Sequence, residues 1–266
     1  MNQKESLEYN SLTEQPLVWT ALITPLFADG AIDYASLKHL ALQQNKAKNG
    51  ILLLGSTGEG IALSAEERLT IVEYVSAMSL DVPLMVAVGG YNLNEQSAWI
   101  EQCNQLPLLD SAKLPCMLYN VPSRTGGEIA LSALQQVQSH ENCWALKEAS
   151  GDLNKLLAYR QHCPNVELYS GEDAMMPYLA AADVKGLVSV CANVWPEATR
   201  RYVELALAKN HAGLFPLWHQ AISALFQVTS PIAVKVLLAE LNVISSATLR
   251  LPLCQDELAE DHGLQA

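Results

Sequence analysis

Short apolar runs alternate with longer amphipathic runs through the first 210 residues of the chain. The apolar runs begin near residues 18, 51, 83, 116, 143, 166 and 187, and apolar residues at helical spacing follow each of them. Apolar runs without polar alternation are typical of strands that are buried on both faces of a parallel sheet. The alternation therefore predicts parallel strands joined by helices, either as a (β/α) barrel or as a doubly wound sheet.

Turn and capping residues set the boundaries of these elements. Ser64 and Glu67 have the spacing of a capping box at a helix start. Either Ser150 or Asp152 can cap the helix that follows the fifth strand. The expected strands are 18–26, 51–54, 83–88, 116–119, 143–147, 166–169 and 187–190. The expected helices are 34–48, 64–78, 94–105, 129–138, 153–162, 174–182, 196–209, 212–228 and 231–241.

Two features favour the barrel over the doubly wound sheet. Polar and glycine-containing stretches follow several different strands, as they do around the mouth of a barrel. The first strand is not followed by GxGxxG, which is the fingerprint of a dinucleotide-binding sheet. We therefore expect a flexible lead-in at 1–16, a TIM-type (β/α) barrel over 17–210 and an all-helical C-terminal subdomain over 211–266.

Composition narrows the class of function. The chain has 266 residues, half of them hydrophobic, which is enough for a large core. The net charge of −12 argues against nucleic acid and against an anionic membrane surface as partners. No apolar run is long enough to span a bilayer, and the polar first 16 residues lack the apolar region of a signal peptide. We therefore expect a cytoplasmic protein.

The cysteines and histidines suggest neither a disulfide framework nor a metal site. None of the six cysteines forms a CxxC pair, and the six histidines lack HxH or HxxxH spacing. Cys116, Cys143 and Cys191 lie in apolar, strand-like runs, so we expect buried thiols. We therefore expect no metal site.

Lys147 is the first candidate for chemistry. It ends the buried strand that begins at Cys143, and the loop 148–152 follows it. Active sites of barrels lie at the carboxyl ends of the strands. Burial favours the neutral form of an amine, which can attack a carbonyl carbon. The alternative is a structural lysine that pairs with a neighbouring carboxylate.

Three further features could cooperate with such a lysine. Tyr119 also stands at a strand end, where it could act as a general acid and base; it could equally be a core aromatic residue. The loop Gly55–Gly60 carries two hydroxyls that could relay a proton, although it could be an ordinary glycine-rich turn. The guanidinium of Arg124 could bind a carboxylate through two parallel hydrogen bonds, or it could form an ion pair at the surface. Together these groups suit imine chemistry with an anionic substrate.

Several stretches together resemble the dihydrodipicolinate synthase/N-acetylneuraminate lyase superfamily, and within it the dihydrodipicolinate synthases. They are ALITPL, LLLGSTGEG, LYNVPSRTG, LKEASGD, YSGEDA, GLVSVCANV, SPIAVKVLLAEL and TLRLPL, in family order between Ala21 and Leu253. YNVPSRTG in particular resembles the synthases, because its arginine is their ligand for the carboxylate of the aldehyde substrate; the sialic-acid lyases differ there.

The resemblance implies a fold, a reaction and an assembly. The fold is a TIM-type barrel. The reaction is an aldol-type condensation of pyruvate with L-aspartate 4-semialdehyde through a Schiff base, on the route to diaminopimelate and lysine. No metal or organic cofactor takes part. Most members are homotetramers built from dimers, so we expect a dimer or a tetramer.

The resemblance also implies a role for each matched residue. Lys147 is the Schiff-base lysine, and Tyr119 is the proton donor and acceptor. Ser56 matches the hydroxyl relay residue, which is a threonine in many members. Among the substrate ligands, Thr57 holds the pyruvate carboxylate and Arg124 binds the aldehyde substrate. Gly171 and Val188 match positions that line the pyruvate pocket.

The chain departs from the family between the third strand and Cys116. The family has a further strand and helix there, and this unit supplies a tyrosine that crosses the dimer interface and completes a Tyr–hydroxyl–Tyr proton relay. The interval 89–115 can hold only one helix with its connections, because a βα unit takes about 30 residues. We expect seven strands, adjacent placement of strands 83–88 and 116–119, slow condensation and a weakened dimer.

Two other interpretations remain open. One is a related pyruvate-dependent 2-oxo-acid aldolase with the same lysine and tyrosine, against which Arg124 argues. The other is a folded but catalytically impaired homologue that binds pyruvate or a partner, which the missing βα unit supports.

Overall fold

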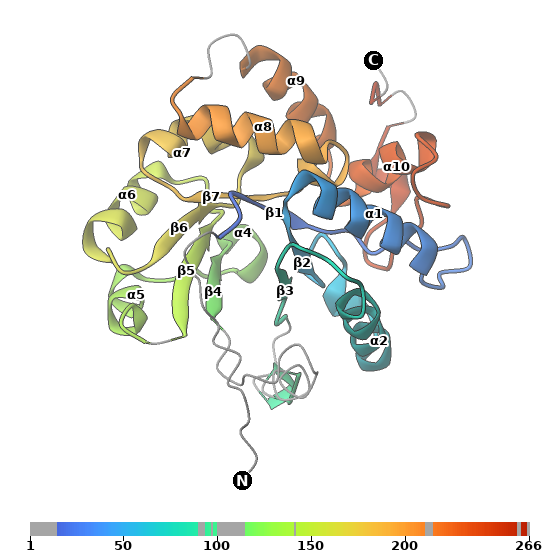
Figure 1. Ribbon diagram of the computed structural model, residues 1–266, viewed down its shortest axis with the longest axis horizontal. Helices are drawn as coiled ribbons and strands as arrows, with labels where there is room; N and C mark the ends of the chain where they lie inside the picture. The colour runs from blue at the N-terminus through green and yellow to red at the C-terminus, as the bar shows by residue number, and fades with distance from the viewer. Residues whose placement is uncertain are drawn as a thin grey trace.

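The chain forms one curled sheet of seven parallel strands with helices on its outer side (Figure 1). This computed structural model describes residues 15–89, 94–96, 98–99, 115–140, 142–210, 215–259 and 262–264. The strands follow the order β3-β2-β1-β7-β6-β5-β4. The predicted TIM-type architecture with seven strands is therefore confirmed.

The strands and helices fall close to the predicted positions. The strands are β1 (Val18–Ala21), β2 (Gly50–Leu53), β3 (Leu84–Val86), β4 (Cys116–Asn120), β5 (Cys143–Glu148), β6 (Glu167–Ser170) and β7 (Gly186–Ser189). The helices are α1 (Tyr34–Ala47), α2 (Ala65–Ser76), α4 (Pro122–Thr125), α5 (Leu131–Val137), α6 (Leu153–His162), α7 (Met176–Ala181), α8 (Pro196–Leu207), α9 (Phe215–Leu225) and α10 (Ile232–Glu240). Of the helix expected at 94–105, the described residues 94–96 and 98–99 are helical.

The first strand is shorter than predicted. It ends at Ala21 rather than at residue 26. The reason is that the Ile23 backbone N–H donates to the Asn193 side chain at 3.0 Å, and Pro25 has no N–H to offer to a neighbouring strand. The residues after Ala21 therefore leave the ladder and run toward the mouth of the barrel.

Helix caps follow the predicted chemistry. The Glu67 backbone N–H donates to the Ser64 hydroxyl at 3.1 Å, and the Ser64 backbone N–H donates to the Glu67 carboxylate at 2.8 Å. The capping box is therefore confirmed. Of the two candidates for the cap of α6, Asp152 takes the position and accepts the Asn154 N–H at 2.8 Å. This cap fixes where the loop after Lys147 becomes a helix.

Two layers of core surround the sheet. An inner cluster on the concave side contains Trp19, Ala21, Ala145, Tyr169 and Val188, one or two from each of four strands. A larger outer cluster lies between the sheet and the helices. Because neighbouring residues of a strand point to opposite faces, every second residue of β5 and β6 faces the barrel interior. Lys147 follows Ala145 on that face.

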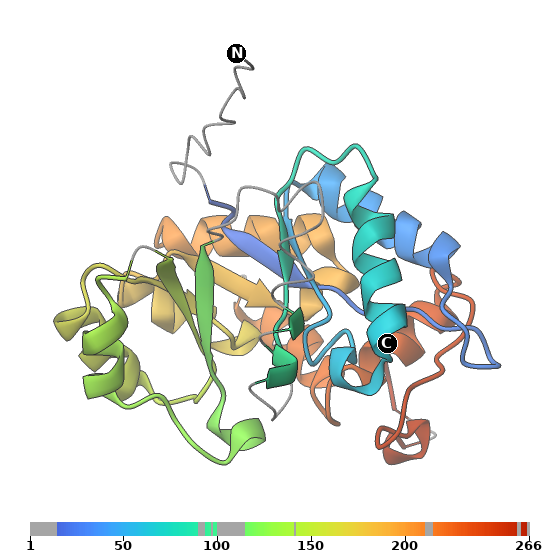
Figure 2. The same cartoon turned by 90° about the horizontal axis from the view of Figure 1, so that it is seen from below.

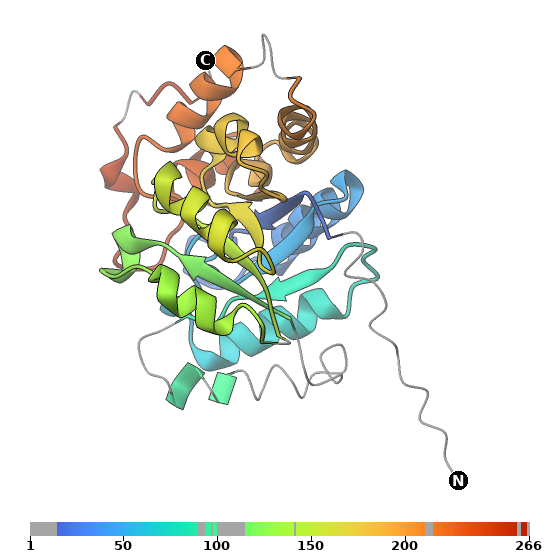
Figure 3. The same ribbon diagram turned by 90° about the vertical axis from the view of Figure 1, so that its left-hand side faces the viewer.

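The sheet is open between β3 and β4. These strands are the two ends of the strand order, and no hydrogen bond joins them within the described residues. Figures 2 and 3 show that the sheet curls until the two end strands face each other. The two end strands therefore lie near each other, as predicted, but the described residues leave the sheet unclosed between them.

The open side also explains a wrong prediction about the cysteines. Cys191 is buried as expected, whereas Cys143 is only partly buried and Cys116 is exposed. Cys116 begins β4, which is an end strand of the sheet and therefore lacks a second neighbouring strand among the described residues. Cys103 lies outside the described residues.

The C-terminal helices pack onto the barrel. The indole N–H of Trp218 on α9 donates to the Asp173 carbonyl at 3.3 Å, and its ring stacks on Tyr202 at 4.2 Å between centroids. Arg250 donates a backbone hydrogen bond to Glu59 at 2.6 Å. The predicted division into a barrel and a C-terminal subdomain stays a prediction. No described helix combines the length and the apolar character needed to cross a bilayer.

Candidate active site

Lys147 lies at the carboxyl end of β5, where the sequence places it. Its side chain is 8% exposed and stands above Ala145 on the inner face of the strand. All strand pairs of the sheet are parallel, so the carboxyl ends of all seven strands open onto the same side of the molecule. Lys147 is therefore a nearly buried amine at the mouth of the barrel.

Tyr119 is the direct neighbour of Lys147 across β4 and β5. The Lys147 Nζ atom lies 4.2 Å from the centroid of the Tyr119 ring. Tyr119 is 39% exposed, whereas Lys147 is nearly buried. On the other side of Lys147, the neighbour across β5 and β6 is Tyr169, which is buried in the inner cluster. The amine thus lies between two tyrosine-bearing strands.

Gly171 provides the space for the lysine side chain. A Cβ atom built on Gly171 would lie 2.8 Å from Lys147 Cε and 2.5 Å from Ala149 Cβ, which are distances that real Cβ atoms do not show. Val188, the other residue assigned to the pyruvate pocket, is fully buried in the inner cluster on β7. Both residues therefore lie on the barrel side that Lys147 faces.

The loop Gly55–Gly60 follows β2 and reaches the same edge of the sheet. Thr57 is buried in it, and Ser56 is exposed. The turn is tight, because a Cβ atom on Gly60 would lie only 2.0 Å from the Leu54 carbonyl oxygen. Within the described residues no hydrogen bond joins Ser56 to Tyr119 or to Lys147. The loop brings its two hydroxyls to the mouth of the barrel but does not link them to the lysine directly.

Arg124 lies on α4 in the loop after β4 and is exposed. It has no direct contact with Lys147 among the described residues, but both cations act on Glu172. Burial raises the pKa of Glu172, the carboxylates of Asp173 and Glu148 add to the rise, and the charges of Lys147 and Arg124 oppose it. The mouth therefore holds two basic side chains and the partly buried side chain of Glu172, and basic side chains favour the binding of anionic substrates.

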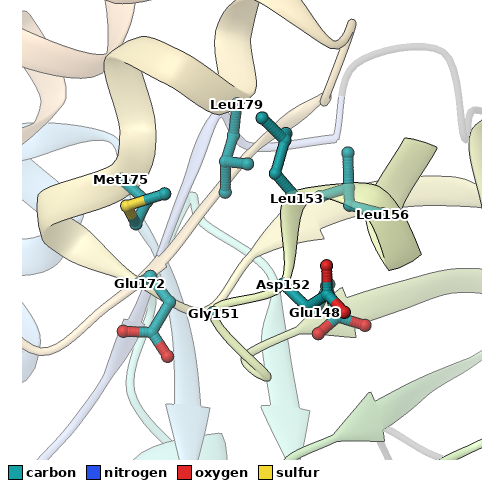
Figure 4. A pocket seen from close by; sticks show the side chains of 8 residues that line it. All are labelled: Glu148, Gly151, Asp152, Leu153, Leu156, Glu172, Met175 and Leu179. Carbon is teal, nitrogen blue, oxygen red and sulfur yellow. The ribbon is translucent and has the colours of Figure 1, made fainter.

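Two acidic residues next to the site, Glu172 and Glu148, were not singled out from the sequence. Figure 4 shows both at a small pocket between the loop after β5 and helix α7, with Asp152 and the apolar side chains of Leu153, Leu156, Met175 and Leu179. The signal that could have found them is adjacency, because Glu148 follows Lys147 and Glu172 follows Gly171 directly. In the described part of the chain, no three His, Cys, Asp or Glu side chains converge in a way that could hold a metal ion.

Comparison with known proteins identifies the family. A sequence model of the Dihydrodipicolinate synthetase family matches residues 16–107 and 106–266, so the match is split inside the interval 89–115. The 4-hydroxy-tetrahydrodipicolinate synthases of Francisella philomiragia and of Wolbachia pipientis from Culex pipiens are 44% and 36% identical, each over 91% of both chains. A solved dihydrodipicolinate synthase from Bacillus anthracis superposes with a TM-score of 0.86 at 25% identity, over 95% of this chain and 97% of that one. The chain belongs to the dihydrodipicolinate synthetase family.

Proposed function

We propose that the chain is an enzyme that condenses pyruvate with L-aspartate 4-semialdehyde, as a 4-hydroxy-tetrahydrodipicolinate synthase of lysine and diaminopimelate biosynthesis. The relatives at 36–44% identity carry this name over nine tenths of both chains. In the structure, the main support for this proposal is the nearly buried Lys147 amine, whose Nζ atom lies 4.2 Å from the centroid of the Tyr119 ring. The alternative of another 2-oxo-acid aldolase has no observation in its favour.

The first step is imine formation with pyruvate. The neutral Lys147 amine attacks C2 of pyruvate, and water leaves as the C=N bond forms. Gly171 leaves the room that the Lys147 side chain occupies beside the ketoacid, and Thr57 binds the carboxylate of the ketoacid. Removal of a proton from C3 then gives the enamine, which is the carbon nucleophile of the condensation.

The second step joins the two substrates. The enamine carbon attacks the aldehyde carbon of aspartate semialdehyde, and Tyr119 delivers the proton that the new alkoxide requires. Ser56 serves as the hydroxyl that connects Tyr119 with solvent. The substrate's amino group then attacks the imine carbon, which closes the ring and releases Lys147. Arg124 holds the carboxylate of the aldehyde substrate, supported by its effect on Glu172 at the same mouth.

The open side of the sheet bears on rate and assembly. In the family, the unit missing here supplies the tyrosine that completes the proton relay at the dimer interface. Loss of a proton-transfer partner costs about 10²–10⁴-fold in rate. We therefore expect imine formation to be retained, condensation to be slow and the dimer or tetramer to be weakened. The cytoplasmic location also stays a prediction.

A steady-state assay tests the proposal. Purified protein is mixed with pyruvate and L-aspartate 4-semialdehyde, and the cyclic product is followed through its reduction by an excess of the next enzyme. Lys147→Met should abolish turnover, whereas Lys38→Met on the exposed face of α1 should leave it unchanged. Turnover that survives in Lys147→Met would contradict the assignment. Cleavage of sugar acids without condensation would indicate the aldolase alternative.

A further inference from the structure

Asn120 and Glu148 form a buried pair directly behind the two reactive side chains. Asn120 follows Tyr119 on β4, Glu148 follows Lys147 on β5, and the two residues are neighbours in the sheet. The Asn120 Nδ2 atom donates to Glu148 Oε2 at 2.8 Å, and the residues are 1% and 3% exposed. Because side chains alternate along a strand, the pair points away from the barrel interior that Lys147 faces.

The remaining atoms of the pair hold the adjoining loops. The Glu148 Oε1 atom accepts the Ser150 backbone N–H at 2.6 Å, and Asn120 Oδ1 accepts the Ile129 backbone N–H at 2.9 Å. A carboxylate can only accept, so the amide nitrogen of Asn120 must face Glu148 and its oxygen must face Ile129. Each polar side-chain atom of the pair thus has a specific partner.

The pair is placed where the sheet offers the least other support. β4 is an end strand, and its only hydrogen-bonded neighbour among the described residues is β5. The pairing of these strands is irregular at Cys116 and Met117, where the register shifts. Among the described residues, β4 is therefore held by backbone hydrogen bonds to β5 alone, and this pairing is irregular where β4 begins.

We propose that Asn120 and Glu148 are a positioning pair for the condensation, which holds the Tyr119 ring in register with the Lys147 amine. This inference rests on the proposed function, because it assigns the pair to the same reaction. Neither side chain touches the substrate; each acts through the neighbouring residue on its strand. A displacement of about 1 Å at a reacting centre can cost on the order of 10²-fold in rate.

Two complementary substitutions test the pair. Glu148→Gln places an amide nitrogen against the Asn120 amide nitrogen, and Asn120→Asp places two carboxylates together in a buried site. Each single variant should slow borohydride-trapped imine formation and kcat by about 10–100-fold. In the double variant Asn120→Asp/Glu148→Gln, the glutamine amide donates to the aspartate, while Ser150 and Ile129 keep their acceptors. The double variant should therefore recover most of both rates.

A matched control separates positioning from general stability. Asn49 is a fully buried asparagine that donates to Gln44 at 3.0 Å just before β2, at the opposite end of the barrel. Asn49→Asp should lower the melting temperature without changing the rate of imine formation in the folded protein. If a single variant at the pair does not fold, Asn120→Ala is measured in its place, and a wild-type rate in that variant overturns the inference.

The outcomes distinguish this inference from the proposed function. If the wild-type protein forms no imine with pyruvate, the proposed function fails. If it forms the imine but the single variants do so at the wild-type rate, or the double variant is as slow as the slower single variant, the positioning role is overturned.

Discussion

Replacing Lys235 by methionine should destabilise the protein strongly, although the residue lies on the C-terminal helix α10. Its side chain is 0% exposed and forms an ion pair with Glu59, whose side chain is 2% exposed. The Lys235 Nζ atom also donates to the Thr248 carbonyl at 2.8 Å. Burial lowers the pKa of Lys235, and the Glu59 carboxylate offsets part of that shift. The lysine is therefore the counter-charge of a carboxylate that water cannot reach.

The expected magnitude follows from that burial. Removing one partner of a buried ion pair leaves an uncompensated charge and costs about 3–5 kcal/mol. For a chain of this size, that cost lowers the melting temperature by on the order of 10 °C. Removing both charges in Glu59→Gln/Lys235→Met should restore most of the stability, because the glutamine oxygen can still accept the Arg250 N–H that Glu59 accepts at 2.6 Å.

The assay is thermal and urea unfolding of the single and double variants, with Lys38→Met at an exposed position of α1 as the control. Glu59 belongs to the loop that carries Ser56 and Thr57, so the single variant should also raise the KM for pyruvate. A single variant that is as stable as the control, or a double variant that is no more stable than the single one, would show that the buried Lys235–Glu59 pair does not stabilise the fold.

Three further predictions concern the mouth of the barrel. Gly171→Ala should slow imine formation by about 10–100-fold, because the new Cβ would lie 2.8 Å from Lys147 Cε. The control is Gly127→Ala, whose Cβ would have no atom within 4 Å. Equal rates in the two variants would show that the Lys147 side chain is not crowded at Gly171. Burial raises the pKa of Glu172 above 4.5, so the folded state binds this proton more tightly and stability falls as the pH rises from 4.5 to the raised pKa. Over that pH range, the urea midpoint of Glu172→Gln should therefore rise relative to that of the wild type. A difference between the two midpoints that does not change with pH would show that burial does not raise the pKa of Glu172. Arg124→Ala should weaken binding of the aldehyde by about 1.5–3 kcal/mol, seen as a higher KM, while pyruvate imine formation is unchanged; equal loss of both would mean that Arg124 belongs to the pyruvate site.

The sequence predicts the parts of this structure that depend on local pattern. The strands, the capping box of Ser64 and Glu67, and the strand-end place of Lys147 follow from periodicity and from turn residues, which act over a few positions. To predict that Lys147 lies beside Tyr119, the order of the strands in the sheet must also be known. The resemblance to a known family supplied that order, because apolar runs alone do not specify which strands become neighbours.

Other features depend on contacts between distant parts of the chain. Lys235 and Glu59 lie on segments that are far apart in sequence, and nothing in the stretch SPIAVKVLL indicates that its lysine pairs with a buried carboxylate. The exposure of Cys116 follows from the open end of the sheet, whereas its apolar neighbours predicted a buried strand. The raised pKa of Glu172 likewise depends on its burial and on charges that the fold brings together.

The proposed reaction depends on a covalent imine between the Lys147 amine and pyruvate. The most direct measurement is to incubate the protein with pyruvate and borohydride and to locate the modified lysine by peptide mass spectrometry. We expect one reduced pyruvate per chain, attached to Lys147 and absent without pyruvate. A label on Lys235, on any other lysine, or on none would contradict it.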